Sequence, residues 1–293
     1  MVSLRRNSTR RLSRLASPPM FSDRIAVSIL LIPLAMSVIA AGGIVYLLGI
    51  LLIFVLAAQE YAVLFRAGRF RPAQPLIVGG VALLITAEQF PALNPYGLAF
   101  ALALLLPLVW HLIDYERGAA TSGADFAVTV GGIFYLGWMG SYFIALRALP
   151  GGLWWVVATL SSMWLADSGA YSLGRRFGKH KMSPRLSPRK TWEGYVGSVL
   201  TGAVGGGLLS AFWHVGAGPD SLLTWQTGAS LGALVGALGP VGDLGISMMK
   251  RQVGLKDTGA LLAGHGGALD RMDSWLVAVT VGYYFVLVLQ AVS

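Results

Sequence analysis

The sequence contains no cysteine in 293 residues, and this absence excludes disulfide bonds, a thiolate zinc site and a cysteine nucleophile. Charge is also scarce, because charged residues make up 12% of the chain and hydrophobic residues 55%. Soluble domains carry about 25% charged residues. A chain this apolar cannot cover its surface in water, so the composition argues against a soluble enzyme and excludes a disordered chain.

Long apolar runs separate short blocks of basic residues, which outnumber acidic residues by 22 to 13. A nucleic-acid-binding protein would gather this charge on one soluble face, so we expect a membrane protein and no nucleic-acid partner. A membrane-spanning helix needs about 20 apolar residues. The sequence therefore predicts an all-α polytopic integral membrane protein with about nine transmembrane helices, at residues 25–41, 44–65, 73–90, 96–113, 126–146, 149–166, 195–213, 222–239 and 274–291.

The basic residues predict the orientation of these helices. If the N-terminus is cytoplasmic, all but one of the 22 basic residues are cytoplasmic, the exception being Arg147, and the C-terminus is external. We expect a protein of the cell (inner) membrane whose active site faces the cytoplasm. The expected regions are a basic cytoplasmic tail (1–24), transmembrane helices 1–5 (25–152) and a catalytic transmembrane region (153–293) with cytoplasmic loops 167–194 and 240–273.

The basic tail is expected to contact anionic lipid, and a cleaved secretory signal is the alternative interpretation. More apolar segments follow it and its charged region is long, which favours the tail.

Three acidic residues indicate a metal site at the cytoplasmic ends of two predicted helices. Asp270 and Asp273 are three residues apart and share one helix face, about 5–6 Å apart. Asp243 follows the eighth predicted helix at a similar depth. Three carboxylates at one membrane level favour a divalent cation held by oxygen ligands, most naturally Mg²⁺. The alternative is an acidic pair that stabilises the start of a helix.

A glycine-rich loop precedes this acidic pair and consists of Gly264, His265, Gly266 and Gly267. Glycines let backbone amides approach an anion closely, and a helix start favours phosphate. A plain turn is the alternative for the loop. A structural role is the alternative for His265, although its glycine neighbours leave it without an obvious packing partner.

Basic residues and hydroxyls near these acids suit a polyphosphate. Ser247, Lys250, Arg251, Lys256 and Asp257 come shortly before the loop, and the segment 167–194 carries seven basic and two acidic residues. Interfacial lysines, a surface ion pair and an ordinary cytoplasmic loop are the alternative interpretations.

The residues in this order resemble the phosphatidate cytidylyltransferase family, also called CDP-diacylglycerol synthases. The string 247–273 carries the resemblance, through Ser247, Lys250, Arg251, Lys256, Asp257, and Gly264 to Asp273. Asp167, Ser187, Lys190, Thr191, Glu193, Gly194, Gly242 and Asp243 match further positions of the family. One departure is Ala263, where the family usually has proline.

The resemblance implies an enzyme that joins CTP to phosphatidic acid in the membrane and gives CDP-diacylglycerol and pyrophosphate. It implies Mg²⁺ at Asp243, Asp270 and Asp273, with a second cation left open. The implied catalytic residues are these three, Lys250 and His265. The implied substrate-binding residues are Asp167, Ser187, Lys190, Thr191, Glu193, Ser247, Arg251, Lys256, Asp257, Gly264, Gly266, Gly267 and Arg271. A homodimer is left open as a partner.

Two other functions are considered. A cation or proton transporter would bury carboxylates in mid-membrane, but Glu60 and Glu88 are the only acids inside predicted helices. A CDP-alcohol phosphatidyltransferase would carry an Asp-Gly-x-x-Ala-Arg motif followed by spaced aspartates, which this sequence lacks.

Overall fold

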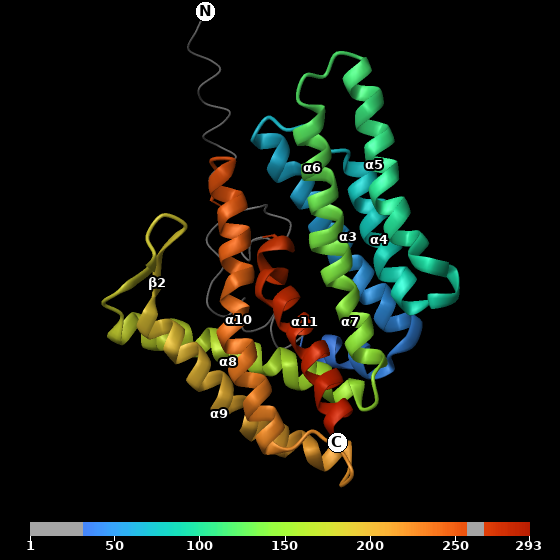
Figure 1. Ribbon diagram of the computed structural model, residues 1–293. Helices are drawn as coiled ribbons and strands as arrows, with labels where there is room; N and C mark the ends of the chain where they lie inside the picture. The colour runs from blue at the N-terminus through green and yellow to red at the C-terminus, as the bar shows by residue number, and fades with distance from the viewer. Residues whose placement is uncertain (1–31, 257–266) are drawn as a thin grey trace, which may run out of the picture.

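The computed structural model describes residues 32–256 and 267–293. Its main elements are long helices, which Figure 1 shows in chain order. The helices, long and short, are Ile32–Ala41, α3 (Gly43–Ala67), α4 (Gln74–Gln89), the 3-10 helices η1 (Pro91–Leu93) and η2 (Pro95–Gly97), α5 (Leu98–Glu116), α6 (Ser122–Gly132), the π-helix η3 (Ile133–Trp138), α7 (Met139–Ala148), α8 (Gly152–Phe177), α9 (Trp192–Ala217), α10 (Trp225–Gln252) and α11 (Leu269–Val292). The strands β1 (Lys181–Ser183) and β2 (Ser187–Thr191) form an antiparallel hairpin.

Within residues 32–256 and 267–293, six helical segments are long and apolar enough to cross a membrane. They are α3, α5, the continuous segment Ser122–Ala148, α9, α10 and α11. Each predicted transmembrane segment overlaps a helix of the part of the chain that the structure describes. The helical membrane fold is therefore confirmed, with the small hairpin as an exception to the all-α expectation, and the count of nine spans stays a prediction.

The helices form two groups joined by α11. Figure 1 shows α3 to α7 on one side, α8, α9 and α10 on the other, and α11 between them. The last helix packs against α10 and α8 in one group and against α7 and α3 in the other. Large side chains fill the first group, including the fully buried Phe54, Ile77, Ile85, Leu136 and Leu146.

Small residues hold the second group together. Cβ atoms added at Gly202 or Gly232 would collide with the backbone of the opposite helix. The hydroxyl of Ser198 on α9 donates to the carbonyl of Gly236 on α10 at 2.9 Å. The backbones of α9 and α10 are thus nearly in contact, as small residues allow in helices that pack within membranes.

Two helices extend beyond the predicted apolar segments. The predicted loop 167–194 begins inside α8, which continues to Phe177, and the predicted loop 240–273 begins inside α10, which continues through Pro240 to Gln252. A helix of 26 residues measures about 39 Å, longer than a hydrocarbon core of about 30 Å. The polar ends of α8 and α10 therefore stay helical beyond the predicted apolar segments, and Arg175 and Arg176 in the last turn interact favourably with the helix dipole of α8.

Arg147, the one basic residue expected outside, has a structural partner. Its Nε donates to the carbonyl of Ile39 at 2.9 Å, and its Nη2 donates to the carbonyl of Ala40 at 3.4 Å. These carbonyls belong to the last turn of the helix Ile32–Ala41. The guanidinium group therefore satisfies acceptors that a helix end leaves unpaired.

Candidate active site

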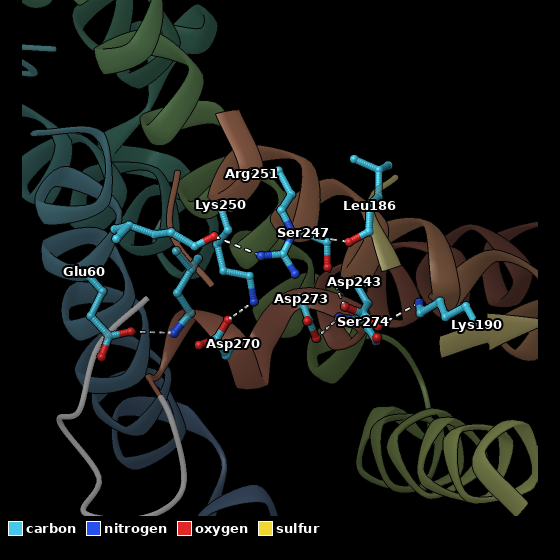
Figure 2. A network of polar contacts seen from close by, with 12 residues as sticks. Glu60, Leu186, Lys190, Asp243, Ser247, Lys250, Arg251, Asp270, Asp273 and Ser274 are labelled. Atoms are coloured by element: carbon cyan, nitrogen blue, oxygen red, sulfur yellow. Dashed lines mark hydrogen bonds and ion pairs between the residues drawn. The ribbon is translucent and has the colours of Figure 1, made fainter. Parts of the chain in front are cut away.

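The acidic residues singled out from the sequence come together from two neighbouring helices. Asp243 lies on α10, and Asp270 and Asp273 lie in the first turns of α11. Gly242 contacts the backbone carbonyl of Asp273 so closely that an added Cβ atom would overlap it. Figure 2 shows the side chains of these acids near one another, together with Lys190, Ser247 and Lys250.

Two lysines from different segments pair with two of these acids. Lys190 on β2 reaches the carboxylate of Asp243 at 2.7 Å, and Lys250 on α10 donates to Asp270 at 2.6 Å. The hydroxyl of Ser247 also donates to Asp243, at 3.3 Å. The Lys250–Asp270 pair is largely buried, with side chains 14% and 16% exposed, so it is shielded from water more than a surface ion pair.

Asp167 on α8 completes the acidic group. Desolvation of its carboxyl group and repulsion from Asp243 raise the pKa of Asp167 to about 6, whereas the charge of Lys190 opposes the rise. Solvent screens part of this effect, because the residue as a whole is exposed. Asp243 also exerts the strongest repulsion on the carboxylate of Asp273, ahead of Asp167. The four acids therefore belong to one electrostatic site.

The chemistry of this site suits a divalent cation. Asp167, Asp243, Asp270 and Asp273 supply oxygen donors and more negative charge than Lys190 and Lys250 can balance. Within residues 32–256 and 267–293, however, no three acidic or histidine side chains are placed closely enough to hold an ion. Lys190 and Lys250 form ion pairs with the carboxylates of Asp243 and Asp270 in this structure. The assignment of Mg²⁺ to these acids stays a prediction.

A buried acid of the first helix group fixes the start of α11. Glu60 on α3 is 3% exposed, and its Oε2 accepts the backbone N–H of Leu269 at 2.9 Å. Figure 2 shows this bond beside Asp270. A side-chain acceptor at a helix start satisfies one of its unpaired N–H groups. The sequence marked Glu60 as an acid inside an apolar helix but gave it no partner.

The hairpin residues have structural contacts. Thr191 caps α9 by accepting the N–H of Gly194 at 3.2 Å, and Glu193 accepts from the backbone N–H of His180 and contacts its ring at 2.6 Å. Arg251 donates to the carbonyl of Leu186 at 3.5 Å, next to Ser187. These bonds hold the hairpin so that Lys190 reaches Asp243.

Three other expected site residues, Lys256, Gly267 and Arg271, are among the described residues, and four are not. Lys256 and Arg271 are exposed, whereas Gly267 is buried just before α11. Asp257, Gly264, His265 and Gly266 lie outside the described residues.

The fold and the site define a helical membrane protein in which acidic and basic groups from α10, α11 and the hairpin pair with one another. A family model described as the cytidylyltransferase family matches residues 22–289, and the chain belongs to this family. It is similar to the phosphatidate cytidylyltransferase of Synechocystis, with 32% identity over 92% of this chain and 98% of the relative. Proteins of the same name from Mycobacterium bovis (33% identity, 74% of this chain, 72% of the relative) and Brucella suis (36%, 72% and 70%) are also similar.

Proposed function

We propose that this protein transfers the cytidylyl group of CTP to phosphatidate and releases pyrophosphate, giving CDP-diacylglycerol. The observation that carries the proposal is the similarity, along nearly the whole chain, to relatives named phosphatidate cytidylyltransferase. Four of the residues that carry the resemblance also form ion pairs, Lys190 with Asp243 and Lys250 with Asp270, and this supports the proposal. Apolar helices around that site suit a substrate that is itself a membrane lipid.

The reaction needs two anions to meet. An oxygen of the lipid phosphate attacks the α-phosphorus of CTP and forms the new P–O bond. The bond from the α-phosphorus to the bridging oxygen breaks, and pyrophosphate leaves with its electron pair. The lipid phosphate is already an anionic nucleophile, so positioning and charge stabilisation are the main requirements.

Lys190, Lys250 and Arg251 provide the positive charge for this reaction. In the structure the two lysines pair with carboxylates, at 2.7 Å and 2.6 Å. Asp243, Asp270 and Asp273 would hold Mg²⁺, which neutralises phosphate charge when bound, and a second cation is left open. Lys190 and Lys250, which pair with Asp243 and Asp270 in the structure, would contact phosphate oxygens of the substrates.

The topology belongs to the same proposal. Nine transmembrane helices with a cytoplasmic N-terminus would put the acids, the lysines and the hairpin on the cytoplasmic side of the inner membrane, where CTP is available. Reporter fusions at Ala119, Asn94 and the C-terminus should read cytoplasmic, external and external. A cytoplasmic C-terminus would contradict the odd number of spans. Cross-linking in the membrane tests the homodimer.

One assay tests the activity. Purified protein with CTP, radiolabelled phosphatidic acid and Mg²⁺ should form a lipid-linked CDP product, and chelation of Mg²⁺ should abolish its formation. Consumption of CDP-diacylglycerol with an alcohol acceptor would identify a phosphatidyltransferase instead. Ion flux in vesicles without CTP-dependent product would identify a transporter. Either result would overturn the proposal.

A further inference from the structure

A tyrosine of the first helix group lies in an unusual turn that faces the acidic site. Tyr135 belongs to η3, a π-helix inside the membrane-length segment Ser122–Ala148. A π-helical turn inserts an extra residue into a helix, which is rare and occurs frequently at functional sites. The turn rotates the residues that follow it and changes the direction in which the side chains of the segment point.

The hydroxyl of Tyr135 is buried and has no hydrogen-bond partner within the part of the chain that the structure describes. Other buried tyrosines of the same helix group do have partners. The hydroxyl of Tyr46 donates to the carbonyl of Phe143 at 3.2 Å, and that of Tyr61 donates to the carbonyl of Val128 at 3.1 Å. A buried polar group without a partner destabilises a protein, so the unpaired hydroxyl of Tyr135 needs an explanation.

The contacts of this hydroxyl point to the candidate active site. A Cβ atom added at Gly245, two residues after Asp243 on α10, would lie 4.0 Å from it. The carboxylates whose charge acts on the hydroxyl are those of Asp273 and Asp243. The hydroxyl therefore lies against α10 beside the acids of the site, although the residue comes from the other helix group.

We propose that Tyr135 is a substrate-binding residue, whose hydroxyl donates a hydrogen bond to a phosphate oxygen of a bound substrate. This inference rests on the proposed function, since it assigns a further contact to the same site. Phosphate oxygens are strong acceptors, and a phenol is a neutral donor that adds no charge to a site already containing lysines. The phosphate belongs either to phosphatidate or to CTP.

The acids themselves do not need this donor. Asp243 accepts from Lys190 and Ser247, Asp270 accepts from Lys250, and an oxygen of Asp273 accepts the N–H of Ser274 at 2.6 Å. A phenylalanine would fill the same space between α10 and η3 without burying an unpaired hydroxyl. A ligand that arrives at the site explains why a donor is placed there.

The substitution Tyr135→Phe tests the proposal, because it removes only the hydroxyl. A hydrogen bond to a charged phosphate is worth about a ten- to hundredfold change in binding or rate. We expect kcat/KM to fall by this factor, while the thermal stability of the ligand-free protein stays equal or rises. A higher KM for phosphatidate alone would assign the contact to the lipid, and a higher KM for CTP alone would assign it to the nucleotide.

Tyr46→Phe is the matched control, because it removes a buried hydroxyl that has a protein partner remote from the acids. We expect it to lower thermal stability and leave both KM values and kcat unchanged. Wild-type kinetics in Tyr135→Phe would overturn the proposal, and so would equal kinetic losses in the two variants.

A second measurement keeps this test separate from that of the proposed function. The melting temperatures of purified wild-type protein and of Tyr135→Phe are measured before and after addition of CTP, pyrophosphate or phosphatidate micelles. The rise caused by each addition is then compared between the two proteins. A smaller stabilisation of the variant by one of these phosphates supports the contact even in a protein without cytidylyl transfer. If each of the three additions stabilised Tyr135→Phe as much as the wild type, the proposal would be overturned, whatever the activity of the wild type.

Discussion

Replacing Gly242 by alanine changes the distance between the two helices that carry the acids. A Cβ atom at this position would overlap the carbonyl oxygen of Asp273 and lie 3.1 Å from a methyl carbon of Val277. The overlap is with backbone, so α10 and α11 must separate by about 1 Å at the level of Asp243. Neither partner is a flexible side-chain end that could turn aside at this point.

The expected effect on activity is larger than the effect on stability. Overpacking costs roughly 1–3 kcal/mol, and alanine regains about 1 kcal/mol of helix propensity, so the net loss of stability is about 0–2 kcal/mol. A displacement of about 1 Å between reacting groups can cost roughly a hundredfold in rate. We therefore expect Gly242→Ala to keep its fold and lose roughly a hundredfold in kcat.

The measurement is the initial rate of CDP-diacylglycerol formation by purified protein, with thermal stability recorded on the same samples. Gly79→Ala is the control, because Gly79 is an exposed glycine of α4 whose added Cβ atom would meet nothing within 4 Å. It should retain full activity and gain up to about 1 kcal/mol of stability. Wild-type activity in Gly242→Ala would show that the close approach of α10 and α11 does not set the geometry of the site.

Three further substitutions test other contacts. Asp273→Asn should fold normally and lose roughly a hundredfold in rate across a Mg²⁺ titration, and near-normal activity at ordinary Mg²⁺ would contradict the metal assignment. Glu60→Leu should lower the free energy of unfolding by about 0.5–2 kcal/mol and reduce kcat. Glu60→Gln keeps an acceptor for the N–H of Leu269 and should stay near wild type. A melting temperature of Glu60→Leu equal to that of the wild type would argue against the role of Glu60 in fixing α11. Thr191→Ala removes the N-cap of α9 and should lower the free energy of unfolding by about 1 kcal/mol. It should also raise the KM for CTP, because it loosens the hairpin that carries Lys190. An unchanged KM would show that the cap does not affect substrate binding.

The sequence was sufficient for features that depend on local pattern. Apolar runs predicted the positions of the helices, and the spacing of Asp270 and Asp273 placed both in the first turns of one helix, α11. The position of Asp243 just after the eighth predicted helix placed it at the same level as these two acids, and the structure brings Asp243 and Asp273 together. The end of α8 was not predictable from hydropathy, because a helix does not end where its apolar part ends.

Contacts between distant segments could not be read in this way. Glu60 and Leu269 are 209 residues apart, and the partner of a buried acid depends on which helices pack together rather than on its neighbours in sequence. The same applies to the hydroxyl of Tyr135, whose direction depends on a π-helical turn inside an ordinary apolar run. Hydrophobic periodicity does not distinguish such a turn from a regular α-helix.

The bond between Arg147 and the helix Ile32–Ala41 has a consequence for biosynthesis. The two residues of the bond to Ile39 are 108 positions apart, so a growing chain presents this helix end long before its arginine has been made. Water or lipid head groups must satisfy the carbonyls of Ile39 and Ala40 until α7 is inserted. The first described helix therefore reaches its final contacts only after α7 has entered the membrane, and chains truncated before Arg147 lack the contact that fixes it.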